Sequence, residues 1–384
     1  MNKHPVWTEI DLNAISHNLM EIRNWLLPTT RIMAVVKGNA YGHGAVKTAL
    51  RLLNNKVDYF GVSRPNEALE LRIAGINIPI LIFGYTPIEF IKEAIRQNIT
   101  LTVYDYKTAK SISDAAISLN KKVKVHIKID TGMGRLGIFI PLIEDQKLYL
   151  HTLDKILDDV ENITNLDGLF IEGIYTHFAV ADSFDYEYST KQLNIFNDFI
   201  YRLSLRKIII PIIHSANSAA MLNFNNSHMN MVRPGICLYG ILPTCCINRQ
   251  INLKPAMTIK ALVAHVKDVP KGSRISYSSI YTTKNDTKIA TIPIGYADGY
   301  RWQKKPKGFV LIHGKLAPIV GRICMDFFMV DVGHLKNVQP SDEVVILGKQ
   351  KDQLITANTL AVNSDTISYE IISSLTARMP RIYI

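Results

Sequence analysis

The spacing of apolar and polar positions predicts a helix first and then a series of strands. An amphipathic helix is predicted over residues 10–26, where apolar side chains recur at the spacing of one helical face. These side chains are Leu12, Ile15, Leu19, Ile22 and Leu26. Short β-branched and apolar runs follow, from "RIMAVV" at 31–36 to "MVRPGICLYG" at 231–240. Most intervals between the runs are long enough for a helix, so strands and helices are expected to alternate.

The number of these runs points to a particular α/β architecture. Eight runs fall within about 240 residues, which favours a closed (β/α)8 TIM barrel over an open parallel sheet. After about residue 245 the runs remain strand-like, but helical intervals nearly vanish until residues 364–375. We therefore predict an N-terminal (β/α)8 barrel at 1–245 and a C-terminal, mainly β domain at 246–384. Pairing of the first few residues with the second domain is left open.

Composition narrows the range of partners and locations. The chain has 384 residues, 47% of them hydrophobic, and a formal charge of 44 − 33 = +11. The basic residues are scattered, which favours a solvated basic surface over a nucleic-acid site. No apolar run is long enough to span a bilayer, and the start has no apolar signal core. We predict a cytoplasmic protein without a membrane or nucleic-acid partner.

The cysteines argue against a metal site. They lack CxxC spacing and a paired histidine pattern, so zinc is not expected and no metal is predicted. Four unpatterned cysteines in a chain of this length are typical of reduced cytosolic thiols. They are Cys237, Cys245, Cys246 and Cys324.

Charged residues at the ends of the predicted strands are the candidates for chemistry. A barrel presents its functional groups at the C-terminal strand ends, and Lys37 ends the first run. Burial lowers the pKa of a lysine, and the neutral amine can form a Schiff base with an aldehyde. A lysine pointing into solvent is the alternative. "RPGI" at 233–236 can expose successive N–H groups to an anion, or it can be a plain turn.

Nine motifs resemble the alanine racemase family, in that family's order and across nearly the whole chain. They are "AVVKGNAYGHG", "HIKIDTGMGRLG", "YTHFAVAD", "HSANSAA", "VRPGICLYG", "ISYSS", "TIPIGYADGY", "VGRICMDFFMVDV" and "TISYE". One such motif would be weak, whereas nine in order are specific. The resemblance implies a (β/α)8 barrel that binds pyridoxal 5′-phosphate (PLP), a C-terminal β domain and a homodimer with shared active sites. It also implies interconversion of L-alanine and D-alanine, which supplies D-alanine for peptidoglycan.

The resemblance assigns roles to matching residues. Lys37 matches the lysine that carries PLP as an internal aldimine, and Tyr277 of the partner subunit matches the second acid–base group. Arg233 matches the arginine facing the pyridine nitrogen, which a guanidinium leaves largely unprotonated because it does not readily give up a proton. His177 matches a histidine bonded to this arginine. Without the resemblance, His177 would be interpreted as a core histidine and Tyr277 as a strand aromatic. The other cofactor contacts implied are Tyr41, Asn217, Ser218, Gly235, Ile236 and Tyr369.

The substrate side is implied in the same way. Arg135 matches an arginine near the substrate carboxylate, and Lys128 matches a lysine often carbamylated in the family. The remaining matches are Met325, Asp326, Tyr296 and Tyr281. Two positions depart from the usual pattern: Gly38 replaces a common alanine, and Arg301 follows Tyr300 without a proline. Neither departure falls on a proposed catalytic position.

Three alternatives compete with an alanine racemase. A related racemase could act on serine or several amino acids, but such relatives tend to carry an export signal and to change the arginine matched by Arg135. A non-catalytic PLP carrier would lack the second domain and with it Tyr277 and Met325. A barrel without PLP would carry the motifs by coincidence.

Overall fold

The computed structural model describes residues 4–141, 145–183, 186–243, 251–304 and 307–384. The chain divides into two compact units. The barrel unit comprises Ser16–Ala40 and Ala45–Leu253, and the C-terminal unit comprises Met1–Ile15, Tyr41–Gly44 and Lys254–Ile384. The expected domain boundary after residue 245 lies outside the described residues, as do Cys245 and Cys246.

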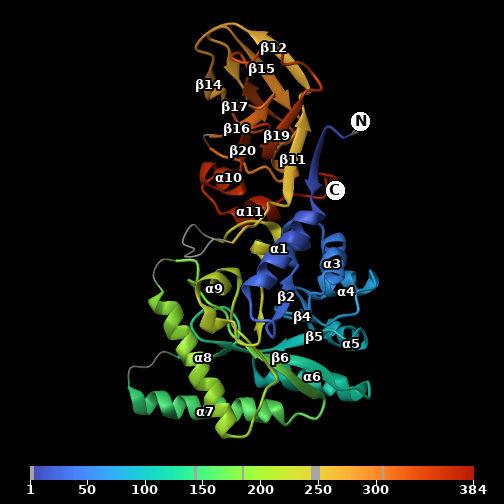
Figure 1. Ribbon diagram of the computed structural model, residues 1–384, viewed down its shortest axis with the longest axis vertical. Helices are drawn as coiled ribbons and strands as arrows, with labels where there is room; N and C mark the ends of the chain where they lie inside the picture. The colour runs from blue at the N-terminus through green and yellow to red at the C-terminus, as the bar shows by residue number, and fades with distance from the viewer. Residues whose placement is uncertain (1–3, 142–144, 184–185, 244–250, 305–306) are drawn as a thin grey trace. The chain divides into compact units, whose positions relative to one another are not determined.

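The barrel unit contains parallel strands in the order β10-β2-β3-β4-β5-β6-β8-β9, with β7 added to β6 (Figure 1). Asn230 brings the end strands together: its side-chain oxygen accepts from the Ile213 N–H at 2.8 Å. The nearly closed barrel confirms the predicted fold, because each of the predicted runs overlaps one of its strands. The strands are β2 Arg31–Val35, β3 Tyr59–Val62, β4 Ile80–Ile82, β5 Thr100–Val103, β6 Val123–Asp130, β7 Ile138–Phe139, β8 Leu169–Tyr175, β9 Ile212–His214 and β10 Met231–Val232.

Helices alternate with these strands, and α3 to α8 lie outside the barrel (Figure 1). The predicted first helix is α1, and Ile15, Leu19 and Ile22 on its apolar face are buried. The helices are α1 Leu12–Trp25, α2 Lys37–Tyr41, α3 Ala45–Asn54, α4 Pro65–Ile73, α5 Ile88–Arg96, α6 Tyr106–Ser118, α7 Gln146–Thr164, α8 Glu187–Leu205 and α9 Ser218–Asn223, with short 3-10 turns η1 Asn225–Ser227 and η2 Ile236–Tyr239.

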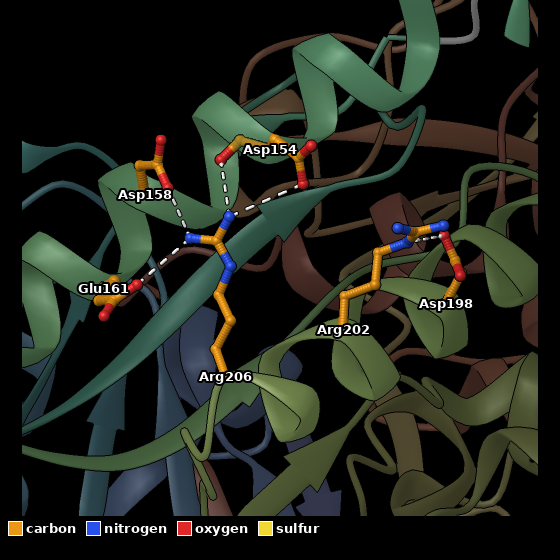
Figure 2. A network of polar contacts seen from close by, with 6 residues as sticks. All are labelled: Asp154, Asp158, Glu161, Asp198, Arg202 and Arg206. Atoms are coloured by element: carbon orange, nitrogen blue, oxygen red, sulfur yellow. Dashed lines mark hydrogen bonds and ion pairs between the residues drawn. The ribbon is translucent and has the colours of Figure 1, made fainter. Parts of the chain in front are cut away.

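An arginine just after α8 ties this helix to α7. Figure 2 shows the Arg206 guanidinium between three carboxylates of α7. Their oxygens lie 3.7 Å (Asp154), 2.5 Å (Asp158) and 3.2 Å (Glu161) from it. By contrast, Arg202 pairs within its own helix with Asp198 at 2.9 Å.

The C-terminal unit is built on a sheet in the order β12-β15-β18-β17-β16-β19-β11-β1-β21, with β20 paired to β19. Strand β1 near the start of the chain pairs antiparallel with β11 and parallel with β21. The mainly β character of this unit is as predicted. Its strands are β1 Val6–Ile10, β11 Met257–Leu262, β12 His265–Val269, β13 Arg274–Ile275, β14 Tyr281–Thr282, β15 Thr287–Ile292, β16 Phe309–Ile312, β17 Lys315–Val320, β18 Phe328–Asp331, β19 Glu343–Gln350, β20 Gln353–Ile355 and β21 Arg381–Tyr383.

Short helical segments complete the C-terminal unit. They are η3 Tyr277–Ser279, η4 Tyr296–Asp298, α10 Ala357–Asn363 and α11 Ser368–Ser373. Helix α11 lies in the interval where helical spacing was expected. Helix α10 was not predicted, although the Thr356 side chain accepts from the Thr359 N–H at its start, as an N-cap residue does.

Candidate functional site

Lys37 lies two residues after the end of strand β2 and begins an unusual backbone turn. Gly38, Asn39 and Ala40 have φ values of 62, 54 and 53°, and Tyr41 follows at 52°. A left-handed conformation costs about 1–2 kcal/mol for each ordinary L-residue, so this turn needs external support. The Gly38 N–H donates to Glu67 Oε1 of α4 at 2.6 Å, and the Ala40 N–H donates to the Val36 carbonyl at 2.8 Å.

The Lys37 amine lies in a partly buried, cationic environment. Burial lowers its pKa, and the nearby charges of Arg135 and Arg233 lower it further, while Glu67 raises it. The direction agrees with the expectation of a partly desolvated strand-end lysine. A lowered pKa increases the neutral fraction of the amine, which is the form that attacks a carbonyl.

Lys128 and His177 belong to the same cluster. Burial lowers the pKa of Lys128 to about 8, with Arg135 and Arg233 contributing. Burial, followed by the charges of Arg233 and Arg135, holds the pKa of His177 well below its ordinary value. The structure thus brings five predicted site residues into mutual electrostatic range at the barrel strand ends.

Arg233 is almost fully buried and is held by four acceptors. Its Nη2 donates to the carbonyls of Thr176 and Ser215, both at 2.8 Å. Its Nη1 lies 2.8 Å from His214 Nδ1, and its Nη2 lies 3.4 Å from His177 Nδ1. The contact to His177 was predicted, but the shorter contact is to His214. Burial lowers the pKa of Arg233 to about 10, so the guanidinium remains charged at neutral pH.

The contacts behind Arg233 define a hydrogen-bonded series, here called the Arg233–Glu172 network. A guanidinium only donates, so His214 Nδ1 must accept. His214 Nε2 then carries the proton and donates to His126 Nδ1 at 2.8 Å. His126 Nε2–H in turn faces Glu172 Oε2 at 3.4 Å. Burial lowers the pKa of both histidines, which keeps them neutral and fixes this order.

Glu172 ends the network as a carboxylate. Burial alone would raise its pKa, but hydrogen bonds from His126, Lys124 and Tyr59 hold it at about 2. The Lys124 contact is 2.6 Å long and reaches a half-exposed ammonium group. The network therefore runs from Arg233 at the site to the barrel surface.

Two helix starts meet near Arg233. Asn217 caps α9 by accepting from the Ala220 N–H at 2.9 Å, and the Gly235 N–H donates to Ser218 Oγ at 2.8 Å. This bond joins the start of α9 to that of η2, where Ile236 is buried. The first N–H groups of a helix have no intrahelical partner and favour an anion. The predicted contacts Asn217, Ser218, Gly235 and Ile236 therefore lie together.

Further predicted residues lie in the C-terminal unit. An open hollow is lined by Tyr277, Met325 and Asp326 together with Ser276, Cys324 and Phe327. Tyr277 is 68% exposed and Met325 52% exposed, so neither residue is buried in the core of this unit. Asp326 is held by Arg378 Nη2 at 2.7 Å.

Tyr296 and Tyr281 differ in their surroundings. The Tyr296 side chain is exposed, while its backbone N–H donates to the Cys324 carbonyl at 3.1 Å, next to the hollow. The Tyr281 hydroxyl donates to Asp331 Oδ2 at 3.2 Å. Tyr281 is therefore engaged in sheet contacts that the sequence did not indicate.

Two predicted phosphate contacts meet in the C-terminal unit as well. The rings of Tyr41 and Tyr369 lie 6.1 Å apart between centroids. The segment Tyr41–Gly44 belongs to this unit, where the Gly42 carbonyl accepts from Arg381 Nε at 2.6 Å. Four residues after Lys37, the chain is thus anchored to a different unit.

Sequence reasoning missed several residues that support the site. Glu67 and Glu172 were not singled out, and His126 and His214 were quoted only as parts of motifs. Glu67 stands three residues after Arg64, a spacing typical of a helix start, but it indicates no contact with the Lys37 turn. The histidines carry no local signal because their partners come from other strands.

A barrel unit with cationic and histidine side chains gathered at its strand ends, together with a second, mainly β unit, places the chain in a class of barrel proteins whose site suits an anionic ligand. Comparison with known proteins narrows this class. Residues 10–243 match the model of the alanine racemase N-terminal domain, and residues 256–383 match that of the C-terminal domain. The chain belongs to the alanine racemase family and is an isomerase, as predicted.

Individual relatives agree with this assignment. The chain is 47% identical to an alanine racemase of Methanococcus maripaludis, over the full length of both proteins. The solved alanine racemase of Clostridium difficile 630 is 40% identical, with a TM-score of 0.92 and coverage of 100% of this chain and 97% of that one. An alanine racemase from Bartonella henselae with covalently bound pyridoxal phosphate is 29% identical, with a TM-score of 0.86 and coverage of 99% and 100%.

Among the described residues, no helix combines the length and apolar character needed to cross a membrane.

Proposed function

We propose that this protein is a PLP-dependent alanine racemase that uses Lys37 and Tyr277 of the partner subunit as its two acid–base groups. The observation that carries the proposal is the environment of Lys37: a partly buried amine at the end of β2, in a member of this family, with Arg135 and Arg233 acting on it. The physiological role proposed is the supply of D-alanine for peptidoglycan, and the proposed location is the cytoplasm.

The residues present fit PLP. Lys37 provides the amine, and the joined starts of α9 and η2 provide N–H groups for the phosphate. Arg233 provides a fixed donor for the ring nitrogen, because its own side chain is immobilised by backbone carbonyls. When bound, PLP supplies a carbonyl carbon for the amine and a ring that withdraws electrons from the substrate α-carbon.

The racemisation itself needs proton transfer on both faces of the α-carbon. Lys37 Nζ takes or returns the proton on one face, and the Tyr277 phenol oxygen does so on the other. Arg233 would donate a hydrogen bond to the ring nitrogen of a bound cofactor without giving up its proton, because a guanidinium only donates and does not readily deprotonate. It would thereby weaken the electron withdrawal that the ring supplies and favour simple proton return.

The remaining proposed roles concern the substrate. Arg135 is proposed to bind the carboxylate of alanine, with Met325 and Asp326 of the partner subunit, and Tyr296 to narrow the entrance. Tyr281 is less suited to line the entrance, because its hydroxyl already donates a hydrogen bond to Asp331. A broad-specificity racemase is the second candidate, and it would be distinguished by substrate range.

Lys128 is proposed to carry a carbamate. Carbon dioxide reacts with neutral amines, and the pKa of about 8 leaves an appreciable neutral fraction near neutral pH. NMR of the protein in ¹³C-bicarbonate should show one slowly exchanging carbamate signal that is lost in Lys128→Ala. No such signal in the unmodified protein would contradict this assignment.

The deciding experiment is incubation of the PLP-loaded protein with single L-amino acids in D2O. We expect rapid α-deuterium incorporation and D-isomer formation with alanine alone. Comparable reaction of serine or other amino acids would reject the substrate assignment, and exchange without inversion would reject the role of Tyr277. Borohydride should fix the cofactor to Lys37, and a peptide map that finds it elsewhere would reject the proposed lysine.

A further inference from the structure

Glu67 lies at the N-terminal turn of α4 and contacts two loops that follow neighbouring strands. Strands β2 and β3 are paired, with Val35 opposite Gly61. Glu67 Oε2 accepts from the backbone N–H groups of Ser63 and Arg64, at 2.7 and 3.0 Å. Its other oxygen, Oε1, accepts from the Gly38 N–H at 2.6 Å. One carboxylate therefore bridges the start of α4 and the turn after Lys37.

The Gly38 contact supports the left-handed turn at its first residue. Each ordinary residue in this conformation costs about 1–2 kcal/mol, and three non-glycine residues with φ above 50°, Asn39, Ala40 and Tyr41, follow at once. A hydrogen bond to a charged acceptor contributes about 1.5–3 kcal/mol. The bond from Gly38 is therefore large enough to offset part of that cost, and it anchors the backbone directly after Lys37 to α4.

The same carboxylate opposes the positive charge of the two arginines near the lysine. Arg135 and Arg233 disfavour protonation of Lys37. Lys128 and His177 also face it, and the lowered pKa of His177 keeps that ring neutral. Glu67 favours protonation. Its contact is with the peptide N–H beside Lys37, so its charge acts on the amine through space.

We propose that Glu67 is a positioning residue for Lys37, which holds the left-handed turn after the lysine and places a compensating negative charge beside the amine. This inference rests on the proposed function only in taking Lys37 as the reacting lysine. Without the charge of Glu67, the amine is deprotonated at lower pH. Without the bridge, the turn loses its anchor to α4.

The test is trace labelling of amines with acetic anhydride in the full-length chain after removal of PLP, with peptide mapping of Lys37 across pH. Only the neutral amine reacts. In Glu67→Gln, the midpoint of Lys37 labelling should move to lower pH by about 0.5–1 unit, which raises labelling at neutral pH about 3- to 10-fold. Exposed lysines in the same digest provide an internal standard.

Glu70→Gln is the matched control, because Glu70 is an exposed carboxylate on the same helix. It removes the same charge and should leave the midpoint unchanged. Glu67→Asp keeps the charge but is one methylene too short to bridge both loops. In Glu67→Asp we expect the pH midpoint of Lys37 labelling to stay close to the wild-type value and the melting temperature to fall. This variant is the second test if Glu67→Gln folds poorly.

Equal labelling of Lys37 in wild type and Glu67→Gln would overturn the proposal, as would equal shifts in Glu67→Gln and Glu70→Gln. A full shift in Glu67→Asp would overturn the role of the charge. The result is separable from the proposed function, because labelling is measured without cofactor. Failure of borohydride to fix PLP on wild-type Lys37 would count against the proposed function and would leave the labelling result standing.

Discussion

Each hydrogen bond of the Arg233–Glu172 network has a defined direction, because the network begins at a residue that only donates and ends at one that only accepts. Arg233 can only donate and ionised Glu172 can only accept. The two neutral histidines between them, His214 and His126, therefore each accept one hydrogen bond on the Arg233 side and donate one on the Glu172 side. A buried network of this kind rigidifies its members only when every one is satisfied. The Arg233 guanidinium thus owes its fixed position partly to the Glu172 carboxylate, which is separated from it by two histidines.

Replacing Glu172 by Gln should destabilise the protein by about 1–3 kcal/mol at neutral pH, because His126 and Lys124 lose a charged acceptor. The folded-state pKa of Glu172 is about 2, against an ordinary value of 4.5. Ionised Glu172 therefore contributes stability above pH 4.5, and this contribution is lost as pH falls toward 2. Urea denaturation should show a wild-type advantage that is largest near pH 6 and shrinks toward pH 3.

Glu93→Gln is the control for this measurement. Glu93 pairs with Arg96 at 3.5 Å on an exposed helix face, and such pairs contribute about 0–1 kcal/mol. We expect Glu93→Gln to change the free energy of unfolding only slightly. If the stability difference between wild type and Glu172→Gln instead grew as the pH falls, the assignment of Glu172 as the ionised end of the network would be contradicted.

At the scale of elements, the barrel strands could be predicted because they are buried on both faces and read as continuous apolar runs. Helix α10 could not, since it is short and buries only one side, through Ala357, Leu360 and Ala361. The strand-end lysine and arginine were visible from sequence as well. Glu67 was not, because its function depends on Gly38, which is 29 residues away in the chain.

The contact between α7 and α8 is likewise a property of the folded chain, since Arg206 and Asp158 are 48 residues apart. Arg206→Ala should lower stability by about 1 kcal/mol, because a guanidinium shared by several carboxylates exceeds an isolated surface pair. The loss should decrease in high salt, which screens exposed charges. Thermal denaturation at low and high salt measures both effects.

Arg202→Ala is the comparison for this prediction. Arg202 pairs with Asp198 within α8 at 2.9 Å, and a pair four residues apart on one helix contributes about 0.3–0.5 kcal/mol. A loss in Arg202→Ala as large as that in Arg206→Ala would contradict the prediction that the Arg206 contacts between α7 and α8 contribute more than a pair within one helix.

At the scale of the whole molecule, the proposed acid–base groups belong to different units of the chain. Lys37 lies in the barrel unit, and Tyr277 lies in the C-terminal unit beside Met325 and Asp326. Tyr277 is 68% exposed, as expected for a side chain that completes a site on another subunit. If the sites are shared across a homodimer, each requires Lys37 from one subunit and Tyr277 from the other.

Mixing subunits tests this arrangement directly. Lys37→Ala and Tyr277→Phe should each be nearly inactive alone. After dissociation and random reassociation of equal amounts, about half of the dimers are mixed, and each mixed dimer has one site with both wild-type residues. Racemase activity should therefore recover to about one quarter of the wild-type value, which follows from two-fold symmetry. Activity is followed as D-alanine formation, with differently tagged subunits to count mixed dimers.

The control separates shared sites from nonspecific recovery. Mixing Lys37→Ala with the double variant Lys37→Ala, Tyr277→Phe leaves no subunit with the lysine, so no activity should return. If Lys37 and Tyr277 instead acted within one subunit, no site in the first mixture would contain both residues. Mixed dimers that form but stay inactive would then show that each subunit carries its own complete site.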